Sequence, residues 1–219
     1  MNVIPYKTMH NVMKKVRSNY CYPSGILGKL MLTKMNHGSS AAMARWGLKN
    51  LTIGPSESIL DIGCGGGANI KRMLALSPDG YAMGVDISSC AISMSEAYNK
   101  KAITQERCDL MKICVSSLPF PNGTFSLVTA FNSVPLWPGP ARSFRQVWEV
   151  LCHGGRFLIV NNEYRDRGDE VIKLSQLSLD MPYYTAEELS YHLRSTGFKD
   201  IEVLHEAKRQ YLCIIARKP

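Results

Sequence analysis

Four glycines and one acid lie within seven residues of this chain, from Asp61 to Gly67. The apolar residues of the run 59–62 predict a buried strand, and a helix-compatible run follows over 68–76. A strand, a glycine turn and a helix together bring a backbone close to a nucleotide and aim the N-terminus of the helix at it. Glycine also tolerates positive φ and places no Cβ between the backbone and a ligand. We therefore expect a cofactor of nucleotide type over this turn.

The acid decides between two kinds of cofactor, because the same residues fit two glycine patterns. Gly63-x-Gly65-x-x-Ala68 fits the dinucleotide fingerprint, whereas Asp61-x-Gly63-x-Gly65-x-Gly67 fits an acidic D-x-G-x-G-x-G pattern. A carboxylate repels a neighbouring pyrophosphate but favours an ammonium or a sulfonium. S-adenosylmethionine carries both of these cations and no phosphate. On these residues the chain resembles the class I S-adenosylmethionine-dependent methyltransferases.

The spacing and the resemblance together predict the residues around the cofactor. Asp86 ends an expected strand over 81–86, 19 residues past Gly67, where an acid accepts hydrogen bonds from both ribose hydroxyls. Family members carry an acid for the adenine amino group after the third strand, but Cys114 stands there in this chain. The expected set is Asp61, Gly63, Gly65 and Gly67 near the methionine end, Asp86 at the ribose, Ile87, Cys114 and Val115 near the adenine, and the Phe131 carbonyl or Asn132 at the methionine ammonium.

Residues for the methyl acceptor are expected after the central strands and in the N-terminal segment. The strand over 125–131 runs into N-S-V-P at 132–135, which is not the N-P-P-Y motif that holds a flipped base, so a nucleic-acid partner is disfavoured. Trp137 either walls the acceptor pocket or plugs a loop. The remaining candidates are Tyr6, Tyr20, Tyr22 and Tyr184 for positioning the acceptor, and His37 and Glu163 as general bases. A lone histidine is more often structural than catalytic.

Metal-dependent O-methyltransferases hold magnesium with carboxylates at these strand ends. This chain offers Asn132, Asn161 and Asn162 there, with Glu163 as the one acid. Hard divalent cations prefer charged oxygens, so we predict no metal.

The elements that must position these residues predict an α/β, Rossmann-like fold. We expect a seven-stranded, mostly parallel sheet with a terminal antiparallel strand and helices on both faces. The further strands are expected over 108–115, 156–160, 200–205 and 210–216, and helices over 41–51, from 89 to beyond 98, over 141–151 and over 185–197. Ser39 and Ser40 are expected to cap the first of these helices, and Thr185 and Glu188 form a capping box for the last. Residues 1–51 would form a helical cap that acts as a substrate lid, and 52–219 the cofactor-binding domain.

Composition limits the class of protein. The chain has 219 residues, of which 45% are hydrophobic and 20% charged, as in an ordinary globular protein. No apolar run approaches the roughly 18 residues of a membrane span, and the N-terminus lacks the apolar block of a secretory signal. Seven scattered cysteines without a C-x-x-C pair indicate neither a disulfide framework nor a zinc site. We therefore expect a cytoplasmic protein.

The net charge of +8 is concentrated in the N-terminal quarter. Residues 1–56 contain eight Lys or Arg and no acid, whereas all 18 acids follow from Glu57 onward. This distribution suits either a solvated basic segment or a grip for an acidic substrate, a nucleic acid or a membrane surface. The bases are scattered, which again disfavours nucleic acid.

Three functions remain open on these residues. The leading one is methyl transfer from S-adenosylmethionine to a small molecule, because M-N-H-G at 35–38 and W-G-L at 46–48 resemble the ubiquinone/menaquinone-biosynthesis type (methyltransferase type 11). The second is an NAD-dependent oxidoreductase, which Asp61 and the lack of a Tyr-x-x-x-Lys motif oppose. The third is a non-catalytic module that keeps the cofactor pocket and acts through its basic N-terminus.

Overall fold

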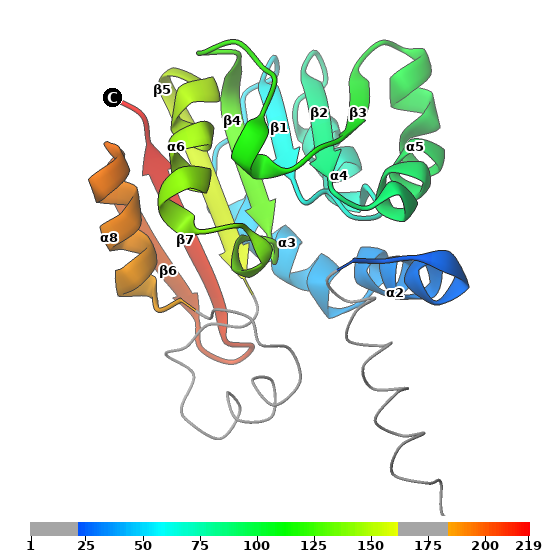
Figure 1. Cartoon of the computed structure of the whole chain (residues 1–219), viewed down its shortest axis with the longest axis horizontal. Coiled ribbons are helices and arrows are strands. Elements are labelled where there is room, and N and C mark those ends of the chain that lie inside the picture. The colour runs from blue at the N-terminus through cyan, green and yellow to red at the C-terminus, as the bar shows by residue number, and fades with distance from the viewer. Residues whose placement is uncertain (1–21, 162–183) are drawn as a thin grey trace, which may run out of the picture.

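A computed structural model describes residues 22–161 and 184–219 and shows one seven-stranded sheet (Figure 1). Its strand order is β3-β2-β1-β4-β5-β7-β6. Only β7, among the described strands, runs antiparallel to its neighbours, which confirms the predicted fold class. The strands are β1 (Ser58–Ile62), β2 (Tyr81–Asp86), β3 (Cys108–Lys112), β4 (Phe125–Phe131), β5 (Leu151–Asn161), β6 (Lys199–Glu206) and β7 (Tyr211–Arg217).

Helices cover both faces of the sheet, and two of them lie along its carboxyl edge (Figure 1). The helices are α2 (Gly25–His37), α3 (Ser39–Lys49), α4 (Ala68–Leu76), α5 (Ser89–Thr104), α6 (Pro140–Val150) and α8 (Ala186–Thr196), with short 3-10 turns η1 (Val115–Ser117) and η2 (Val134–Leu136). One core joins α6 and α8 to the sheet. The other joins α3, α4 and α5 to the opposite face. No helix in the described part of the chain has the length and apolarity to cross a bilayer.

Alternation along β1 explains how one strand serves both cores. Leu60 and Ile62 belong to the core under α6, whereas Ile59 faces the core under α4. Successive side chains in a strand point to opposite faces. Asp61 therefore lies on the α4 face, where Thr129 of the neighbouring β4 donates a hydrogen bond to its Oδ1 (2.8 Å).

Several predicted boundaries need correction. The third strand stops at Lys112 rather than at residue 115, because the chain enters η1. The fifth strand begins at Leu151 rather than at residue 156, since Leu151 already pairs with Phe125 before a register shift. Gly38 occupies the N-cap of α3, so the predicted serine caps are wrong. The capping box of Thr185 and Glu188 is confirmed, with both reciprocal hydrogen bonds present.

Gly67 is expected to matter for stability rather than for ligand contact. Its φ is +80°, and a Cβ there would lie 2.2 Å from Ser95 Oγ and 2.9 Å from the Ser95 Cα. A Gly67→Ala variant should therefore lose about 2–4 kcal/mol of unfolding free energy, from left-handed strain and overpacking together. Gly154→Ala is the matched control: its φ is +72°, but nothing lies within 4 Å of the added Cβ, so only about 1–2 kcal/mol should be lost. Equal losses in urea unfolding would contradict the packing argument.

Candidate active site

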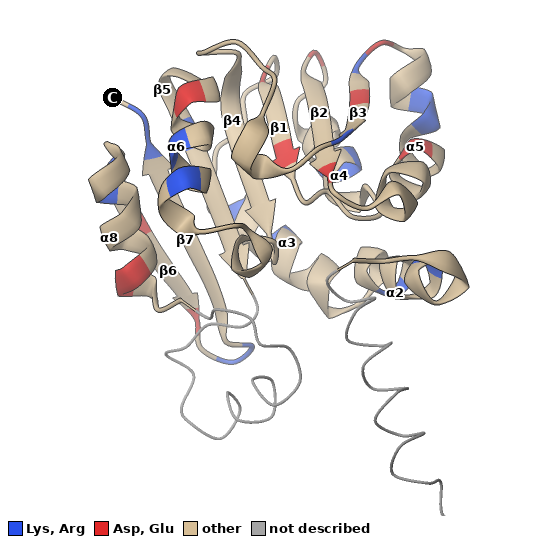
Figure 2. Ribbon diagram, viewed as in Figure 1, with Lys and Arg blue, Asp and Glu red and all other residues tan. Residues whose placement is uncertain are grey.

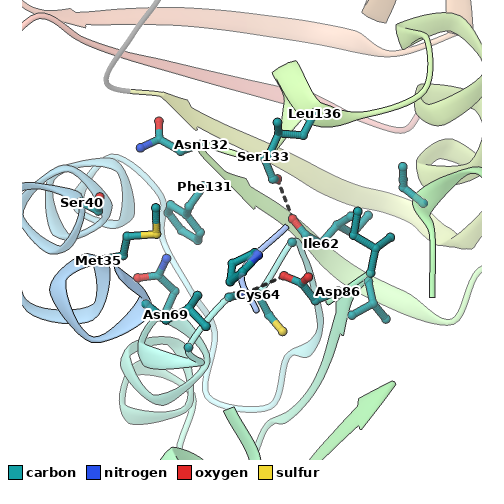
Figure 3. A pocket seen from close by; sticks show the side chains of 18 of the residues that line it. Met35, Ser40, Ile62, Cys64, Asn69, Asp86, Phe131, Asn132, Ser133 and Leu136 are labelled. Carbon is teal, nitrogen blue, oxygen red and sulfur yellow. Dashed lines mark hydrogen bonds between the residues drawn. The ribbon is translucent and has the colours of Figure 1, made fainter. Parts of the chain in front are cut away.

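A cleft lies at the carboxyl edge of the sheet, under α2 and α3 (Figure 3). This is the edge where open α/β sheets bind ligands. The described lining comes from the N-terminal segment (Pro23, Leu32, Met35, Asn36, Ser40 and Met43), the glycine loop and α4 (62–66, Ala68, Asn69 and Arg72), the end of β2 (85–87), the loop after β3 (113–115) and the chain after β4 (131–133 and 136–138).

Backbone hydrogen bonds fix the glycine loop over the end of β2. The amides of Gly63 and Cys64 both donate to the Val85 carbonyl, at 2.8 and 3.1 Å. Ser133 donates to the Ile62 carbonyl (2.6 Å), and a Cβ on Gly63 would lie 2.5 Å from the Ser133 Cβ. Gly63 and Gly65 have φ of +76° and +54°, so both use the freedom that glycine provides. The loop thus presents backbone to the cleft.

Asp86 is oriented by the backbone before any ligand arrives. Gly65 N donates to its Oδ2 (3.0 Å), and Ser88 N donates to its Oδ1 (2.8 Å). Burial raises the pKa of this carboxyl, while the amides oppose that shift. Each carboxylate oxygen has further lone-pair capacity. Asp86 therefore suits a pair of neighbouring hydroxyls, as on a ribose, and it lies where the sequence places it.

Asp61 does not line the cleft, contrary to the expectation that it adjoins the methionine end. It is 1% exposed beneath the loop, with Oδ2 lacking a hydrogen-bond partner among the described residues. Burial, and secondarily the charge of Asp86, raise its pKa to about 7 against the bond from Thr129. Side chains in a strand alternate between its two faces, and β1 continues through Ile62 before the loop begins. The Asp61 side chain therefore points to the α4 face of the sheet and not into the loop. Any influence of Asp61 on a ligand is long-range.

The other expected cofactor residues mostly gather in the cleft. Ile87, Cys114 and Val115 line it near Asp86, and Phe131 and Asn132 line it from β4. Asn132 has a φ of +52°, and its amide donates to the Val160 carbonyl (2.9 Å). Gly67 is not in the wall; it caps α4 in left-handed conformation and packs against α5.

Of the residues predicted to position the methyl acceptor, some line the cleft and others do not. Trp137 lines the cleft and also stacks on Phe157 in the core (centroids 6.1 Å apart, 11° between planes), so the two alternatives for it coexist. His37 is exposed, with Nδ1 3.0 Å from the Thr33 carbonyl and its ring edge-on to Tyr98. The structure thus leaves His37, Tyr22 and Tyr184 out of the cleft wall. The candidates outside the described residues are Tyr6, Tyr20 and Glu163.

Sequence reasoning missed a polar group that links α2, the loop and α4. Asn36 donates from Nδ2 to the Gly66 carbonyl (3.0 Å) and is buried. Arg72 donates to the Asn36 carbonyl (2.8 Å) and to Asn69 Oδ1 (2.6 Å). These two bonds leave three of the five guanidinium N–H donors for a ligand, and no described acid pairs with it. Arg72 lies within α4 and belongs to none of the sequence motifs, so the sequence alone does not indicate its role.

The described residues form no cluster that could bind a metal ion. Across 22–161 and 184–219, His, Cys, Asp and Glu side chains nowhere gather in threes as metal ligands would. The prediction for the whole chain stays a prediction, because Glu163 lies outside these ranges.

Known proteins resemble both the sequence and the fold. The profile of a methyltransferase domain matches residues 60–159. The uncharacterized methyltransferase YdaC of Bacillus subtilis is 20% identical over 177 residues, covering 80% of this chain and 91% of YdaC. The demethylmenaquinone methyltransferase of Symbiobacterium thermophilum is 33% identical over 111 residues, covering 48% of this chain but only 42% of that enzyme. The geranyl diphosphate C-methyltransferase of Streptomyces coelicolor, crystallised with S-adenosyl-L-homocysteine, has a TM-score of 0.71 at 14% identity, covering 82% of this chain and 79% of that one.

The matched profile runs from β1 into β5 and so contains the glycine loop, Asp86 and the end of β4. The oxidoreductase alternative finds no support in these similarities. S-adenosylmethionine also suits the cleft itself, in which Asp86 offers a ribose-type acceptor, the glycine loop presents backbone, and the Arg72 guanidinium has no acid partner among the described residues. The chain thus carries a methyltransferase domain over residues 60–159, and in sequence and fold it is similar to the class I S-adenosylmethionine-dependent methyltransferases.

Proposed function

We propose that this protein methylates an apolar small molecule. The observation that carries the proposal is the wall facing the glycine loop, which is built from side chains without charge: Met35, Met43, Phe131, Leu136 and Trp137. Asp86 is the one acid among the described lining residues, and its oxygens already serve the loop. Apolar walls with a few placed polar groups are typical of sites for apolar ligands. The relative that acts on demethylmenaquinone supports the same class of acceptor.

The cofactor residues are proposed one by one. Asp86 would accept from the ribose hydroxyls, and Ile87, Cys114 and Val115 would enclose the adenine. The carbonyl of Phe131 or the side chain of Asn132 would accept from the methionine ammonium. Arg72 would hold the α-carboxylate, since a guanidinium edge binds a carboxylate with two parallel hydrogen bonds.

The methyl-transfer reaction needs little chemical assistance from these side chains. Bound S-adenosylmethionine supplies a methyl group already activated by the sulfonium charge, and its transfer leaves the neutral sulfide. The protein then contributes alignment and exclusion of water. A base is needed only for an acceptor that arrives protonated. Glu163 remains the proposed candidate for that role, since His37 is not among the residues that line the cleft.

Labelled methyl groups test the proposed acceptor class. The full chain is incubated with methyl-labelled S-adenosylmethionine and, in parallel, reduced short-chain quinones, polar amines, and transfer RNA. We expect label to enter the organic phase with the quinols, together with S-adenosylhomocysteine. Label found only in the amine or in the RNA would contradict the proposal. Two further proposals go with it: the reaction takes place in the cytoplasm, consistent with free thiols at Cys64, Cys108 and Cys213, and nucleic acid is not a partner.

Arg72→Gln should weaken binding of the amino-acid end of the cofactor alone. The lost charged hydrogen bonds predict about 1–2 kcal/mol, the lower part of the range because the guanidinium is partly exposed. Calorimetry would show roughly a 5- to 30-fold rise in the Kd of S-adenosylhomocysteine. 5′-Methylthioadenosine, which lacks the amino and carboxyl groups, is the matched control and should bind both proteins equally. Equal weakening of both ligands would indicate that Arg72 only positions α2.

A further inference from the structure

The outward face of α2 exposes large apolar side chains. Ile26 is 90% exposed and Leu30 is 66% exposed, and Tyr22, which precedes the helix, is 58% exposed. The inward face of the same helix buries Leu32 and walls the cleft through Met35. The helix therefore has apolar residues on two sides, and only the inner set is covered by the described protein.

Two lysines border this outward face. At about 100° per residue, Leu30 lies about 40° from Ile26 around the helix, while Lys29 and Lys34 lie about 60° and 80° to either side of Ile26. All four side chains are exposed. Figure 2 shows blue and no red on α2 and α3, and residues 1–56 contain no acid at all. Thr33 and His37, which are also exposed, lie within about 20° of Ile26 on the same face. Two large apolar side chains with lysines at the borders of the face are features of helices that lie in a membrane interface.

We infer that the outward face of α2, formed by Ile26, Lys29, Leu30 and Lys34, docks on a bilayer rich in anionic lipid. Ile26 and Leu30 would enter the headgroup region, and the lysines would meet lipid phosphates. The helix lies along the carboxyl edge of the sheet, at the border of the molecule (Figure 1). Docking there would bring the cleft beside the membrane, the phase in which an apolar acceptor concentrates.

A second copy of this chain fits the face poorly. The apolar part consists of two or three side chains, far below the roughly 800 Å² that each partner buries in a stable interface. Two such faces in contact would also bring four lysines together without an acid from α2 or α3, which opposes association. A bilayer needs no matching shape and supplies the negative charge.

Vesicle sedimentation tests the inference without cofactor or acceptor, so its failure is separate from failure of the proposed function. The full chain is mixed with phosphatidylglycerol/phosphatidylcholine vesicles and with phosphatidylcholine vesicles, at low and at physiological salt. We expect binding to the anionic vesicles that weakens with salt. Ile26→Ser/Leu30→Ser should reduce it at least tenfold, and Lys29→Gln/Lys34→Gln should reduce both the binding and its dependence on salt.

Matched control variants distinguish binding by the α2 face from non-specific binding of the protein to vesicles. Tyr191→Ser removes another exposed apolar side chain on α8, and Lys100→Gln/Lys101→Gln removes two charges from α5; both should bind vesicles as the parent does. Unchanged S-adenosylhomocysteine binding by the α2 variants would show that the cleft is intact. No binding to anionic vesicles, or equal loss in the controls, would overturn the inference. So would a dimer in sedimentation equilibrium that the Ile26/Leu30 variant dissociates.

Discussion

Replacing Asp86 with alanine is expected to raise the Kd of S-adenosylhomocysteine roughly 30- to 150-fold, which corresponds to about 2–3 kcal/mol. Two losses add. The ribose would lose its charged acceptor, and the Gly65 amide would lose the oxygen that fixes the loop at 3.0 Å. Calorimetry with S-adenosylhomocysteine and with 5′-methylthioadenosine measures the effect. Both ligands carry the ribose, so both should weaken equally, in contrast to the Arg72 variant.

The control for Asp86 is Asp109→Ala. Asp109 lies on the adjacent strand β3, is exposed and accepts from the Tyr81 hydroxyl (2.9 Å). The Asp109→Ala variant removes the same charge from the same sheet, and it should leave the Kd values of both S-adenosylhomocysteine and 5′-methylthioadenosine unchanged. Asp86→Asn keeps one oxygen for the Gly65 amide and should fall between the parent and Asp86→Ala. Equal affinity in Asp86→Ala and the parent would show that the ribose assignment is wrong.

Asp86 lines the cleft and Asp61 does not, and both placements have the same physical origin. Both acids were placed by spacing from the glycines, and local strand–turn–helix geometry fixes such spacing. Asp86 is the last residue of its strand and reaches the loop, whereas Asp61 precedes the bend and points to the α4 core. The alternation of Ile59, Leu60 and Ile62 already contained that information. The acidic glycine motif gives the position of Asp61 in the sequence but not the face of β1 on which its side chain lies.

Helix α2 shows what local sequence could not decide. Asn36 and His37 are adjacent, yet Asn36 is buried against the Gly66 carbonyl and His37 is exposed. Successive helix residues differ by about 100° in direction, so the outcome depends on how α2 docks on the loop. This helix carries apolar side chains on two of its sides, so its hydrophobic pattern does not indicate which side faces the protein. Arg72 escaped notice for a related reason, because its role follows from a contact with Asn36 that is 36 residues away in sequence.

The stability of the protein is expected to fall as pH rises from about 5 to 8, because of Asp61. Its folded-state pKa of about 7 lies above the ordinary 3.8, so in this window the folded state holds a proton that the unfolded chain has lost. Unfolding then releases a proton, and the stability of the folded state decreases as Asp61 ionises in its buried site. At about 1.4 kcal/mol per pH unit over the two units below pH 7, the loss is about 3 kcal/mol.

Asp61→Asn isolates this effect from every other titrating group. The amide is isosteric and uncharged, and its oxygen still accepts from Thr129. In urea unfolding at pH 5, 6, 7 and 8, the variant should gain stability relative to the parent by about 3 kcal/mol across the series. A constant difference would show that Asp61 stays ionised throughout. The same pair of proteins tests the electrostatic hypothesis for the methyl donor: ionised Asp61 should favour the sulfonium. The affinity for S-adenosylmethionine relative to neutral-sulfur S-adenosylhomocysteine should then rise with pH in the parent and not in Asp61→Asn.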